Sequence, residues 1–301
     1  MKVLLIGLKY FSHKLAKDLS EKYPEHSFEA FDTYYSKKDL IKFLWKVRSC
    51  DLVYSIKGTT AQSKAFDWVL KKNKKLIIQW AGTDVLMANE SLKNDSGSRK
   101  YASYAKNYCE APWLIEELKE VGIEAEQLIF TGMNSSKSPK ELPSKFRAFT
   151  YLGKGREEFY GKSFVLSLAE HFPEIEFLIV GSDVGQDRAN IKSLGWVDGL
   201  ESVINDSVIH IRWTDHDSLA NTVIETLQKG RYVIWKNEFE TTINCDSKES
   251  VIKAIKELKN RFDDGSLSLN QEGIDFIKND FDKDKVLANV FNEMKSHVEA
   301  E

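Results

Sequence analysis

The chain alternates short apolar runs with amphipathic segments, and this alternation occurs in two series. In the first series, the apolar runs at residues 3–6, 27–31, 52–56 and 76–80 predict strands, and the segments between them predict helices. Strands that alternate with helices pair in parallel, because each helix carries the chain back to the edge from which the strand began. The pattern therefore predicts an α/β fold with doubly wound parallel sheets.

The second series is separated from the first by a stretch rich in turn residues. Residues 132–144 contain Gly, Asn, two Pro and four Ser, which break the alternation. We therefore place one domain at residues 1–134 and a second at 145–282. A final segment, 283–301, reads as a helix. The apolar runs that predict strands in the second domain are 148–152, 177–180, 191–196, 208–211 and 232–235.

Composition limits the class of protein and its partners. The 301 residues suit two domains, and 42% hydrophobic residues exclude general disorder. A net charge of −3 gives no reason to expect nucleic acid as a partner. Residues 1–144 carry 23 Lys and Arg against 18 Asp and Glu, whereas the remainder carries 20 against 28. A basic half can face an anionic bilayer, and solvated helix faces explain the same excess.

The cysteines and the apolar runs bear on localisation. Cys50, Cys109 and Cys245 are isolated in the sequence and lack the spacing of metal ligands. They fit a reducing compartment. The first residues lack the cleavage region of a signal peptide, and no run approaches the ~18 apolar residues of a membrane span. We expect a cytoplasmic protein, with peripheral contact at the inner membrane face left open.

Two acidic residues stand at a spacing that suits a ligand site. Asp217 and Glu225 are separated by seven residues, and Lys-Gly follows the apolar run after Glu225. A helix that begins near residue 219 would contain Glu225 and leave Asp217 on the preceding loop. Both carboxylates would then lie at the open end of a parallel sheet, where α/β proteins hold their ligands.

A basic, glycine-containing loop precedes this acidic pair. Between the predicted strand 148–152 and the next helix, the sequence supplies Lys154, Arg156 and Lys162 with intervening glycines. Cations and backbone N–H groups at a helix N-terminus favour an anion such as a diphosphate. Gly181 ends the strand 177–180 and would let a ligand approach the backbone closely. The alternative for such a loop is an ordinary solvent-exposed turn.

The order of these motifs resembles that of GT-B glycosyltransferases of the family-4 type (glycosyl transferases group 1). In that family two acidic residues flank seven others, and the first is usually Glu, where this chain has Asp217. The resemblance implies two Rossmann-like doubly wound domains that face a central cleft. It also implies that the helix 283–301 packs back on the first domain. The acceptor would bind to the first domain, and the nucleotide sugar would bind to residues 145–282.

The resemblance also implies roles for the motif residues. Lys162, with Arg156 or Lys154, would hold the donor diphosphate without a metal ion, and no cofactor is expected beyond the nucleoside-diphosphate (NDP) sugar as co-substrate. Glu225 would bind the ribose, and Asp217 would contact the donor sugar or support its orientation. Trp196 would stack on the base or fill the core, and the sequence favours the core.

Residues of the first domain complete the set. Asp84 follows the strand 76–80 in a Gly-Thr-Asp element, which resembles one in some GT-B transferases. We expect it to bind acceptor hydroxyls or, if the reaction inverts the anomeric centre, to act as a general base, and a helix N-cap or turn residue is the alternative. Gly7, after the first strand, would approach the donor. Residues 86–104 read as a polar, mobile loop near the acceptor.

The predicted function is hexosyl transfer from an NDP-sugar to an acceptor hydroxyl, with retention. The acceptor would be a glycan, a lipid-linked sugar or a small molecule. An epimerase or phosphorylase on the same fold, or an inactive subunit of a transferase complex, is the alternative. The sugar, the base, the identity of the acceptor, the choice between retention and inversion and the oligomeric state stay open.

Overall fold

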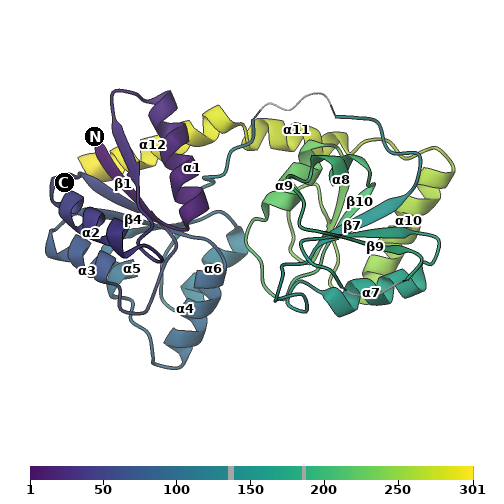
Figure 1. The fold of residues 1–301 in the computed structure, drawn as a ribbon, viewed down its shortest axis with the longest axis horizontal. Coiled ribbons are helices and arrows are strands. Elements are labelled where there is room, and N and C mark those ends of the chain that lie inside the picture. The colour runs from purple at the N-terminus through teal and green to yellow at the C-terminus, as the bar shows by residue number, and fades with distance from the viewer. Residues whose placement is uncertain (135–138, 185–187, 301) are drawn as a thin grey trace. The chain divides into compact units, whose positions relative to one another are not determined.

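The chain forms two compact units, each built around its own parallel sheet (Figure 1). The structure, a computed structural model, describes residues 1–134, 139–184 and 188–300. Unit 1 comprises Met1–Gly132 and Lys283–Glu301, and unit 2 comprises Met133–Asp282. Residues 135–138 of the predicted linker lie outside the described residues, as do 185–187 and 301.

The sheet of unit 1 has the strand order β2-β1-β3-β4-β5-β6, and every pairing is parallel. The chain moves outward in one direction from β1 to β2, and in the other direction from β3 to β6. The strands are β1 (Lys2–Gly7), β2 (Ser27–Ala30), β3 (Leu52–Ile56), β4 (Lys75–Trp80), β5 (Lys106–Cys109) and β6 (Glu126–Gln127).

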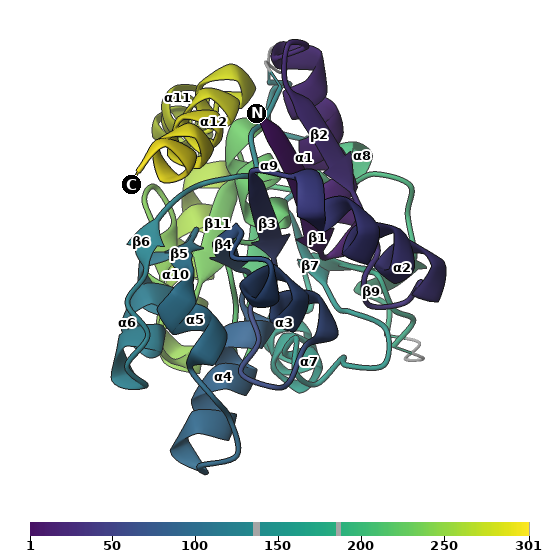
Figure 2. The ribbon, with the colours of Figure 1, turned by 90° about the vertical axis from the view of Figure 1, so that its left-hand side faces the viewer.

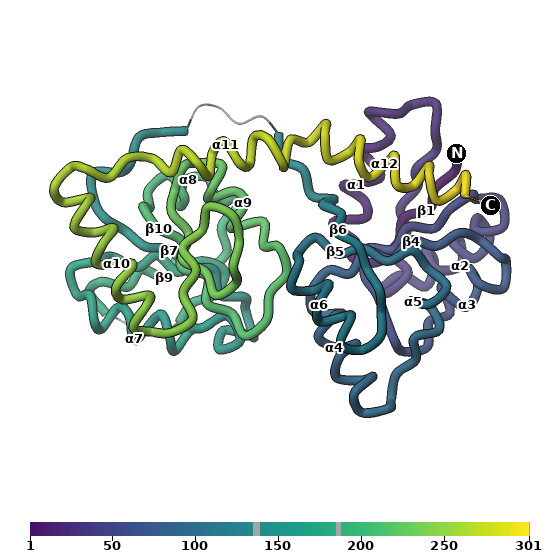
Figure 3. The backbone as a smooth tube through the Cα atoms, turned by 180° about the vertical axis from the view of Figure 1, so that it is seen from behind, coloured from purple at the N-terminus to yellow at the C-terminus, as the bar shows by residue number. Residues whose placement is uncertain are grey.

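Helices cover the sheet of unit 1, and the last helix of the chain belongs to this unit. Helix α12 buries Val290 and Met294 in the same core as Val3 and Leu5 of β1. It lies against α1 (Figure 3), where the rings of Tyr23 and Phe291 stack with centroids 3.9 Å apart. The helices are α1 (Lys9–Lys22), α2 (Lys37–Lys46), the short 3₁₀ helix η1 (Val47–Ser49), α3 (Lys64–Lys71), α4 (Thr83–Lys93), α5 (Lys100–Tyr104), α6 (Pro112–Glu120) and α12 (Lys283–Glu299).

Unit 2 repeats this architecture with the strand order β12-β11-β10-β7-β8-β9, again fully parallel. Its strands are β7 (Arg147–Tyr151), β8 (Glu176–Val180), β9 (Ile191–Gly195), β10 (Ile209–Arg212), β11 (Tyr232–Trp235) and β12 (Ile243–Asn244). Its helices are α7 (Lys162–His171), α8 (Glu201–Asn205), α9 (Asn221–Gln228), α10 (Lys248–Asp263) and α11 (Gln271–Asp280).

Alternate residues of the unit 2 strands face opposite layers of helices. Ala148 of β7 packs in one core with Val165 of α7 and Ile255 of α10, whereas the next residue, Phe149, packs in another with Val203 of α8. Because successive side chains of a strand point to opposite faces, both faces must be apolar. This explains why the strands read as continuous apolar runs, and it confirms the predicted fold of two Rossmann-like, doubly wound sheets.

One prediction about unit 1 is wrong. Residues 86–104, expected as a polar mobile loop, form most of α4 and all of α5. Val85, Ala88 and Leu92 are buried at helical spacing, so the face toward the core is apolar although the segment as a whole is polar. Only the turn between the two helices keeps the predicted loop character. Within the described part of the chain, no helix is both long enough and apolar enough to cross a membrane.

Candidate functional site

The strand order of unit 2 places a switch point between β7 and β10. These neighbouring strands lead into crossovers that run in opposite directions, toward β8 and toward β11. Loops that leave the carboxyl ends of such strands diverge and leave a crevice, which is where open α/β sheets bind ligands. The loops concerned are 152–161, with the predicted basic residues, and 213–220, with Asp217.

The two loops are in direct contact. Gly161, the N-cap of α7, has φ +81°, and a Cβ atom at this position would lie 2.2 Å from the Trp213 carbonyl oxygen. The backbone N–H of Asp215 donates to the Phe159 carbonyl at 3.0 Å. A side chain at Gly161 would therefore push the start of α7 away from the β10 loop.

A carboxylate joins the β7 loop to a third loop, the one that follows β8. Glu157 Oε1 accepts hydrogen bonds from Ser182 Oγ at 2.6 Å and from the Gly155 N–H at 2.9 Å. These bonds, the Ser182 hydroxyl first, lower the pKa of Glu157 to about 2. Gly181, beside Ser182, has φ +92° and approaches the Leu152 carbonyl so closely that a Cβ would lie 2.6 Å from its oxygen. Three strand-end loops thus converge on one edge.

The predicted cations lie in the first of these loops and at the start of α7. Lys162 is the first residue of α7 and is half-buried, whereas Lys154 and Arg156 are exposed. The Arg156 guanidinium lies over the Phe159 ring, 4.0 Å from its centroid. Among the residues that the structure describes, neither Lys154 nor Lys162 has a hydrogen-bond or ion-pair partner for its ammonium group. Lys162 is therefore a cation available to an anion at a helix N-terminus.

Asp217 is held by an arginine that the sequence analysis did not single out. Arg212, the last residue of β10, donates from Nε and Nη2 to the two carboxylate oxygens of Asp217 at 2.7 and 2.8 Å. The side chains are only 8% and 7% exposed. The same guanidinium lies 5.2 Å from the centroid of the Tyr160 ring in the β7 loop. Asp217 is thus one half of a buried ion pair, and this pair also contacts the basic loop.

Glu225 has a different environment. It lies inside α9, the helix that follows the Asp217 loop, and it is half-buried. Its carboxylate accepts no hydrogen bond and forms no ion pair with any residue in 1–134, 139–184 or 188–300. Burial raises the pKa of Glu225, and the charge of Lys229 opposes this shift. A partly desolvated carboxylate without a donor is suited to bind hydroxyl groups of a ligand.

Asp84 and Gly7 belong to unit 1. There Asp84 accepts backbone hydrogen bonds, and Gly7 packs closely against the backbone of Ile56. Asp84 is the second residue of α4 and is buried. Its carboxylate accepts from the backbone N–H groups of Gly58, Ala81 and Val85 at 2.6, 2.9 and 3.1 Å. Burial raises its pKa, and these bonds oppose the shift. Gly7 has φ +104°, and a Cβ there would lie 2.2 Å from the Ile56 carbonyl oxygen.

Two aromatic residues near the motifs differ from each other. Trp196, for which the sequence favoured a core position, is 76% exposed and follows the end of β9. The prediction failed because hydrophobicity alone does not tell which face a strand-end residue takes. His210 is fully buried and stacks on Phe149 with centroids 4.3 Å apart. Burial, with Arg212 nearby, lowers its pKa well below the usual value, so His210 is a neutral core residue.

Arg212 and Glu157 are the residues that the motif analysis missed. Arg212 carried a visible signal, since an arginine at the end of an apolar strand, five positions before an aspartate, needs a partner if it is buried. Glu157 was hidden among the basic residues of its loop. Its partner Ser182 lies 25 positions away, and no pattern links the two.

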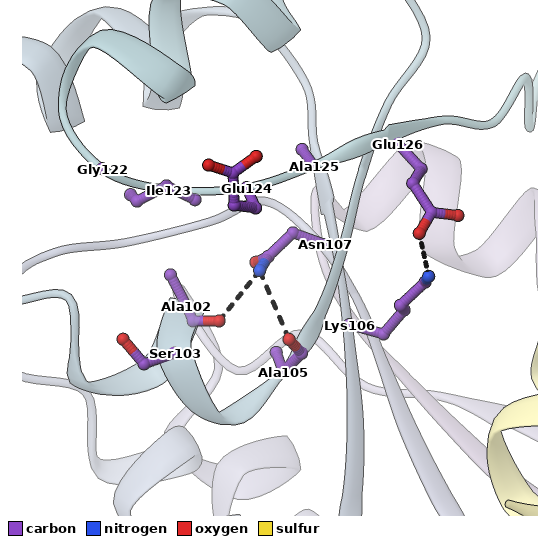
Figure 4. A pocket seen from close by; sticks show the side chains of 10 residues that line it. All are labelled: Ala102, Ser103, Ala105, Lys106, Asn107, Gly122, Ile123, Glu124, Ala125 and Glu126. Atoms are coloured by element: carbon purple, nitrogen blue, oxygen red, sulfur yellow. Dashed lines mark hydrogen bonds and ion pairs between the residues drawn. The ribbon is translucent and has the colours of Figure 1, made fainter.

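A pocket of about 460 Å³ lies elsewhere, at the amino ends of β5 and β6 in unit 1 (Figure 4). Its main polar group, Asn107, is already satisfied. Nδ2 donates to the carbonyls of Ala102 and Ala105 at 2.8 and 3.3 Å, and Oδ1 accepts from Trp80 Nε1 at 3.1 Å. Lys106 and Glu126 form an ion pair at its rim. It lies at the opposite end of the strands from the expected ligand edge, and it presents no free polar group on Asn107.

Comparisons with known proteins decide the fold. No protein-family model and no curated protein matches the sequence. The chain superposes on HepE of Anabaena, solved with UDP and glucose, with a TM-score of 0.69 at 11% identity over 98% of this chain and 100% of that one. It superposes equally well, at 10% identity over 98% and 99%, on the sucrose-phosphate synthase of Thermosynechococcus elongatus. This chain has the GT-B fold.

The GT-B fold hosts more than one reaction among the neighbours. A candidate UDP-N-acetylglucosamine 2-epimerase from Listeria monocytogenes matches with a TM-score of 0.56 at 15% identity, over 99% of this chain and 96% of that one. Activity must therefore be argued from the site. In the part of the chain that the structure describes, no group of three or more His, Cys, Asp or Glu side chains is arranged to hold a metal ion.

Proposed function

We propose that the protein is an NDP-sugar-dependent glycosyltransferase that moves a hexosyl group to an acceptor hydroxyl with retention. The observation that carries the proposal is Lys162, whose ammonium forms no hydrogen bond or ion pair with a described residue, although its charge acts on the nearby Glu157. It stands at the N-terminus of α7, beside the switch point of unit 2. The fold shared with HepE, which was solved with UDP and glucose, supports the choice of donor.

The transfer reaction requires the site to stabilise a leaving diphosphate. As the bond between the anomeric carbon of the sugar and the diphosphate oxygen breaks and the bond to the acceptor oxygen forms, negative charge develops on the phosphate oxygens. Lys162, together with Arg156 or Lys154, would neutralise that charge, and the N–H groups at the start of α7 would add hydrogen bonds. These cations would do the work of a divalent ion, so the proposed reaction needs no metal.

The remaining residues would orient the donor. Glu225 would accept hydrogen bonds from the ribose hydroxyls, and Gly181 would let the nucleotide approach the backbone. Because Arg212 engages both oxygens of Asp217, we assign Asp217 a supporting role in orienting the sugar rather than a direct contact. Trp196, being exposed, is available to stack on the base.

The roles of Gly7 and Asp84 are proposals of the same kind. Gly7 would approach the donor through its backbone, and Asp84 would act on the acceptor side. The three backbone bonds of Asp84 favour a role in shaping the acceptor edge over one as general base. An anionic or lipid-linked acceptor would suit the basic charge of residues 1–144.

Calorimetry with UDP tests the donor site. We expect the affinity for UDP to be the same in EDTA and in Mg²⁺. In a separate assay with UDP-glucose or UDP-N-acetylglucosamine, we expect slow release of UDP. An absolute requirement for Mg²⁺ would contradict the proposed charge neutralisation. Binding without any turnover over a panel of acceptors would point to an inactive subunit.

An epimerase is the second candidate, because the Listeria structure covers nearly the whole chain. Proton NMR of a reaction with UDP-N-acetylglucosamine alone separates the two. A transferase that hydrolyses its donor releases free sugar and UDP, whereas an epimerase of this type yields a second sugar and needs no acceptor. Appearance of a second N-acetylhexosamine without any added acceptor would favour the epimerase.

A further inference from the structure

Helix α2 carries an outward stripe in which basic and apolar residues alternate. Lys38, Ile41, Lys42 and Trp45 follow the three- and four-residue spacing that places side chains on one face of a helix. All four are exposed, with Trp45 at 73% and Ile41 at 59%. Phe43, on the opposite face, is fully buried. The helix is therefore anchored to unit 1 while it presents a large indole to the outside.

More exposed aromatic and basic residues surround this stripe. Tyr34 and Tyr35 precede the helix, and Tyr35 is 91% exposed. Lys37 begins the helix, and the Arg48 guanidinium follows it, 5.9 Å from the centroid of the Trp45 ring. We call these eight residues the α2 surface: Tyr34, Tyr35, Lys37, Lys38, Ile41, Lys42, Trp45 and Arg48.

The cations of the α2 surface are not neutralised. Lys37, Lys38, Lys42 and Arg48 form no ion pair with any residue in the described ranges, whereas their neighbour Lys46 pairs with Glu29. Positive charge next to exposed Trp, Tyr and Ile suits a partner that is anionic at its surface and apolar just beneath. A bilayer of anionic lipids has this profile.

Helix α3 extends the basic character. It packs beside α2 (Figure 2), and Trp68 Nε1 donates to the Leu44 carbonyl at 2.8 Å across the junction. Lys71 and Lys72 lie over the Trp68 ring, 5.0 and 5.2 Å from its centroid. The two helices thus form one positively charged layer on this side of unit 1.

We infer that the α2 surface docks the protein on an anionic lipid bilayer. Trp45, Ile41 and Tyr35 enter the boundary between headgroups and acyl chains, and the Lys and Arg side chains extend to the lipid phosphates. Trp and Tyr favour this boundary because each ring has an apolar body and a polar edge. Binding at this surface involves none of the residues of the proposed donor site, so its success or failure is independent of the glycosyltransferase proposal.

Sedimentation of the full chain with lipid vesicles tests this inference. We expect binding to vesicles of phosphatidylcholine mixed with phosphatidylglycerol, and much weaker binding to phosphatidylcholine alone. Binding should weaken as salt is raised, because the Debye length falls to about 3 Å at 1 M. Equal binding to both vesicle types, or no binding to either, would overturn the inference.

Paired variants locate the binding surface. Lys38→Glu with Lys42→Glu should lower the partition to anionic vesicles by roughly tenfold or more, and Trp45→Ser should lower it by about tenfold. Lys253→Glu with Lys256→Glu makes the same charge change on exposed positions of α10 and should leave binding nearly unchanged. Circular dichroism checks that each variant folds.

Two outcomes would reject the α2 surface as the membrane site. In the first, the α10 pair weakens vesicle binding as much as the α2 pair, which would make net charge the cause. In the second, light scattering shows a dimer that Trp45→Ser converts to a monomer while vesicle binding is unchanged. The surface would then serve a second copy of this chain.

Discussion

The carboxyl edges of the two sheets use their charged residues in opposite ways. In unit 1, the carboxylate of Asp84 is buried and accepts hydrogen bonds from three backbone N–H groups, one in the loop after β3 and two beside the start of α4. In unit 2, Lys162 and Glu225 lie near the same kind of edge without a hydrogen-bond or ion-pair partner among the described side chains. The topology is common to both sheets, so topology alone does not decide where a ligand binds.

The difference separates charges that build the fold from charges that are kept for a ligand. Asp84 joins the loop after β3 to the loop after β4, and its removal would leave buried N–H groups without acceptors. Arg212 and Asp217 likewise contribute to the fold of unit 2, since they form a buried ion pair with each other beside the carboxyl edge of the sheet. Lys162 and Glu225 form no hydrogen bond or ion pair with the side chains that the structure describes, and a ligand would gain most from them.

The largest expected effect comes from breaking the buried ion pair of unit 2. Arg212→Met would take the arginine away from the buried Asp217 carboxylate, which costs about 3–5 kcal/mol of stability. Denaturant unfolding followed by circular dichroism measures this loss. The double variant Arg212→Met/Asp217→Leu should recover most of it, because the buried carboxylate that lost its arginine is then gone as well. A single variant as stable as the parent protein would show that the pair does not hold the edge.

The next effect tests the structural reading of unit 1. Asp84→Ala removes the acceptor of the Gly58 and Ala81 N–H groups and should cost about 2–4 kcal/mol of stability. The affinity for UDP, measured by calorimetry on the fraction that remains folded, should not change. Asp84→Asn is the milder companion, in which transfer to acceptor should fall more than donor hydrolysis. A loss of UDP affinity equal to the loss of transfer would instead assign Asp84 to the donor site.

Much of this architecture was predictable from the sequence, and the reason is local. The strands are buried on both faces, so runs such as that at residues 3–6 are visible without any partner. The Asp217–Glu225 spacing also placed one residue before α9 and the other inside it, as the structure has them.

The sequence did not reveal contacts between distant residues. Asp84 and Gly58 are 26 positions apart, and nothing in either motif reveals that they bond. Helix α4 was mistaken for a loop because its polar residues outnumber the few apolar ones that face the core. The exposure of Trp196 depends on the surroundings of the segment after β9, which hydrophobicity does not encode. The pairing of Arg212 with Asp217 could have been predicted, since the two residues are only five positions apart.

A substitution of Lys162 tests whether the charges at the edge of unit 2 bind a ligand. Lys162→Ala should weaken UDP binding by about 1.5–3 kcal/mol, the range for a hydrogen bond to a charged group, and should barely affect stability. Lys256→Ala on α10 is the matched control and should change neither quantity. Unchanged UDP affinity in Lys162→Ala would remove this residue from the donor site, and a large loss of stability would give it a structural role like that of Asp84.

The smallest expected effect concerns Glu225, and it has opposite signs for stability and for binding. Burial raises the pKa of the folded protein's Glu225 above that of the unfolded chain. The ionised form is therefore disfavoured in the folded state, so the contribution of this group to stability is greatest below about pH 4.3 and falls as the pH rises through the folded pKa. Glu225→Gln removes this cost, and we expect the variant to be more stable at pH 7 by a few tenths of a kcal/mol.

The same substitution should lower the affinity for UDP, because the carboxylate that lowers the stability of the unliganded protein is the group proposed to accept hydrogen bonds from the ribose hydroxyls. Glu225→Gln should weaken UDP binding at pH 7 by roughly 1 kcal/mol. Inorganic pyrophosphate, which lacks the ribose, should bind to the variant and to the parent protein equally well. Thermal unfolding at pH 4 and pH 7 with calorimetry at pH 7 measures both effects. A variant that loses stability and affinity together would place Glu225 with Asp84 among the residues that build the fold, and the contrast between the two edges would then depend on Lys162 alone.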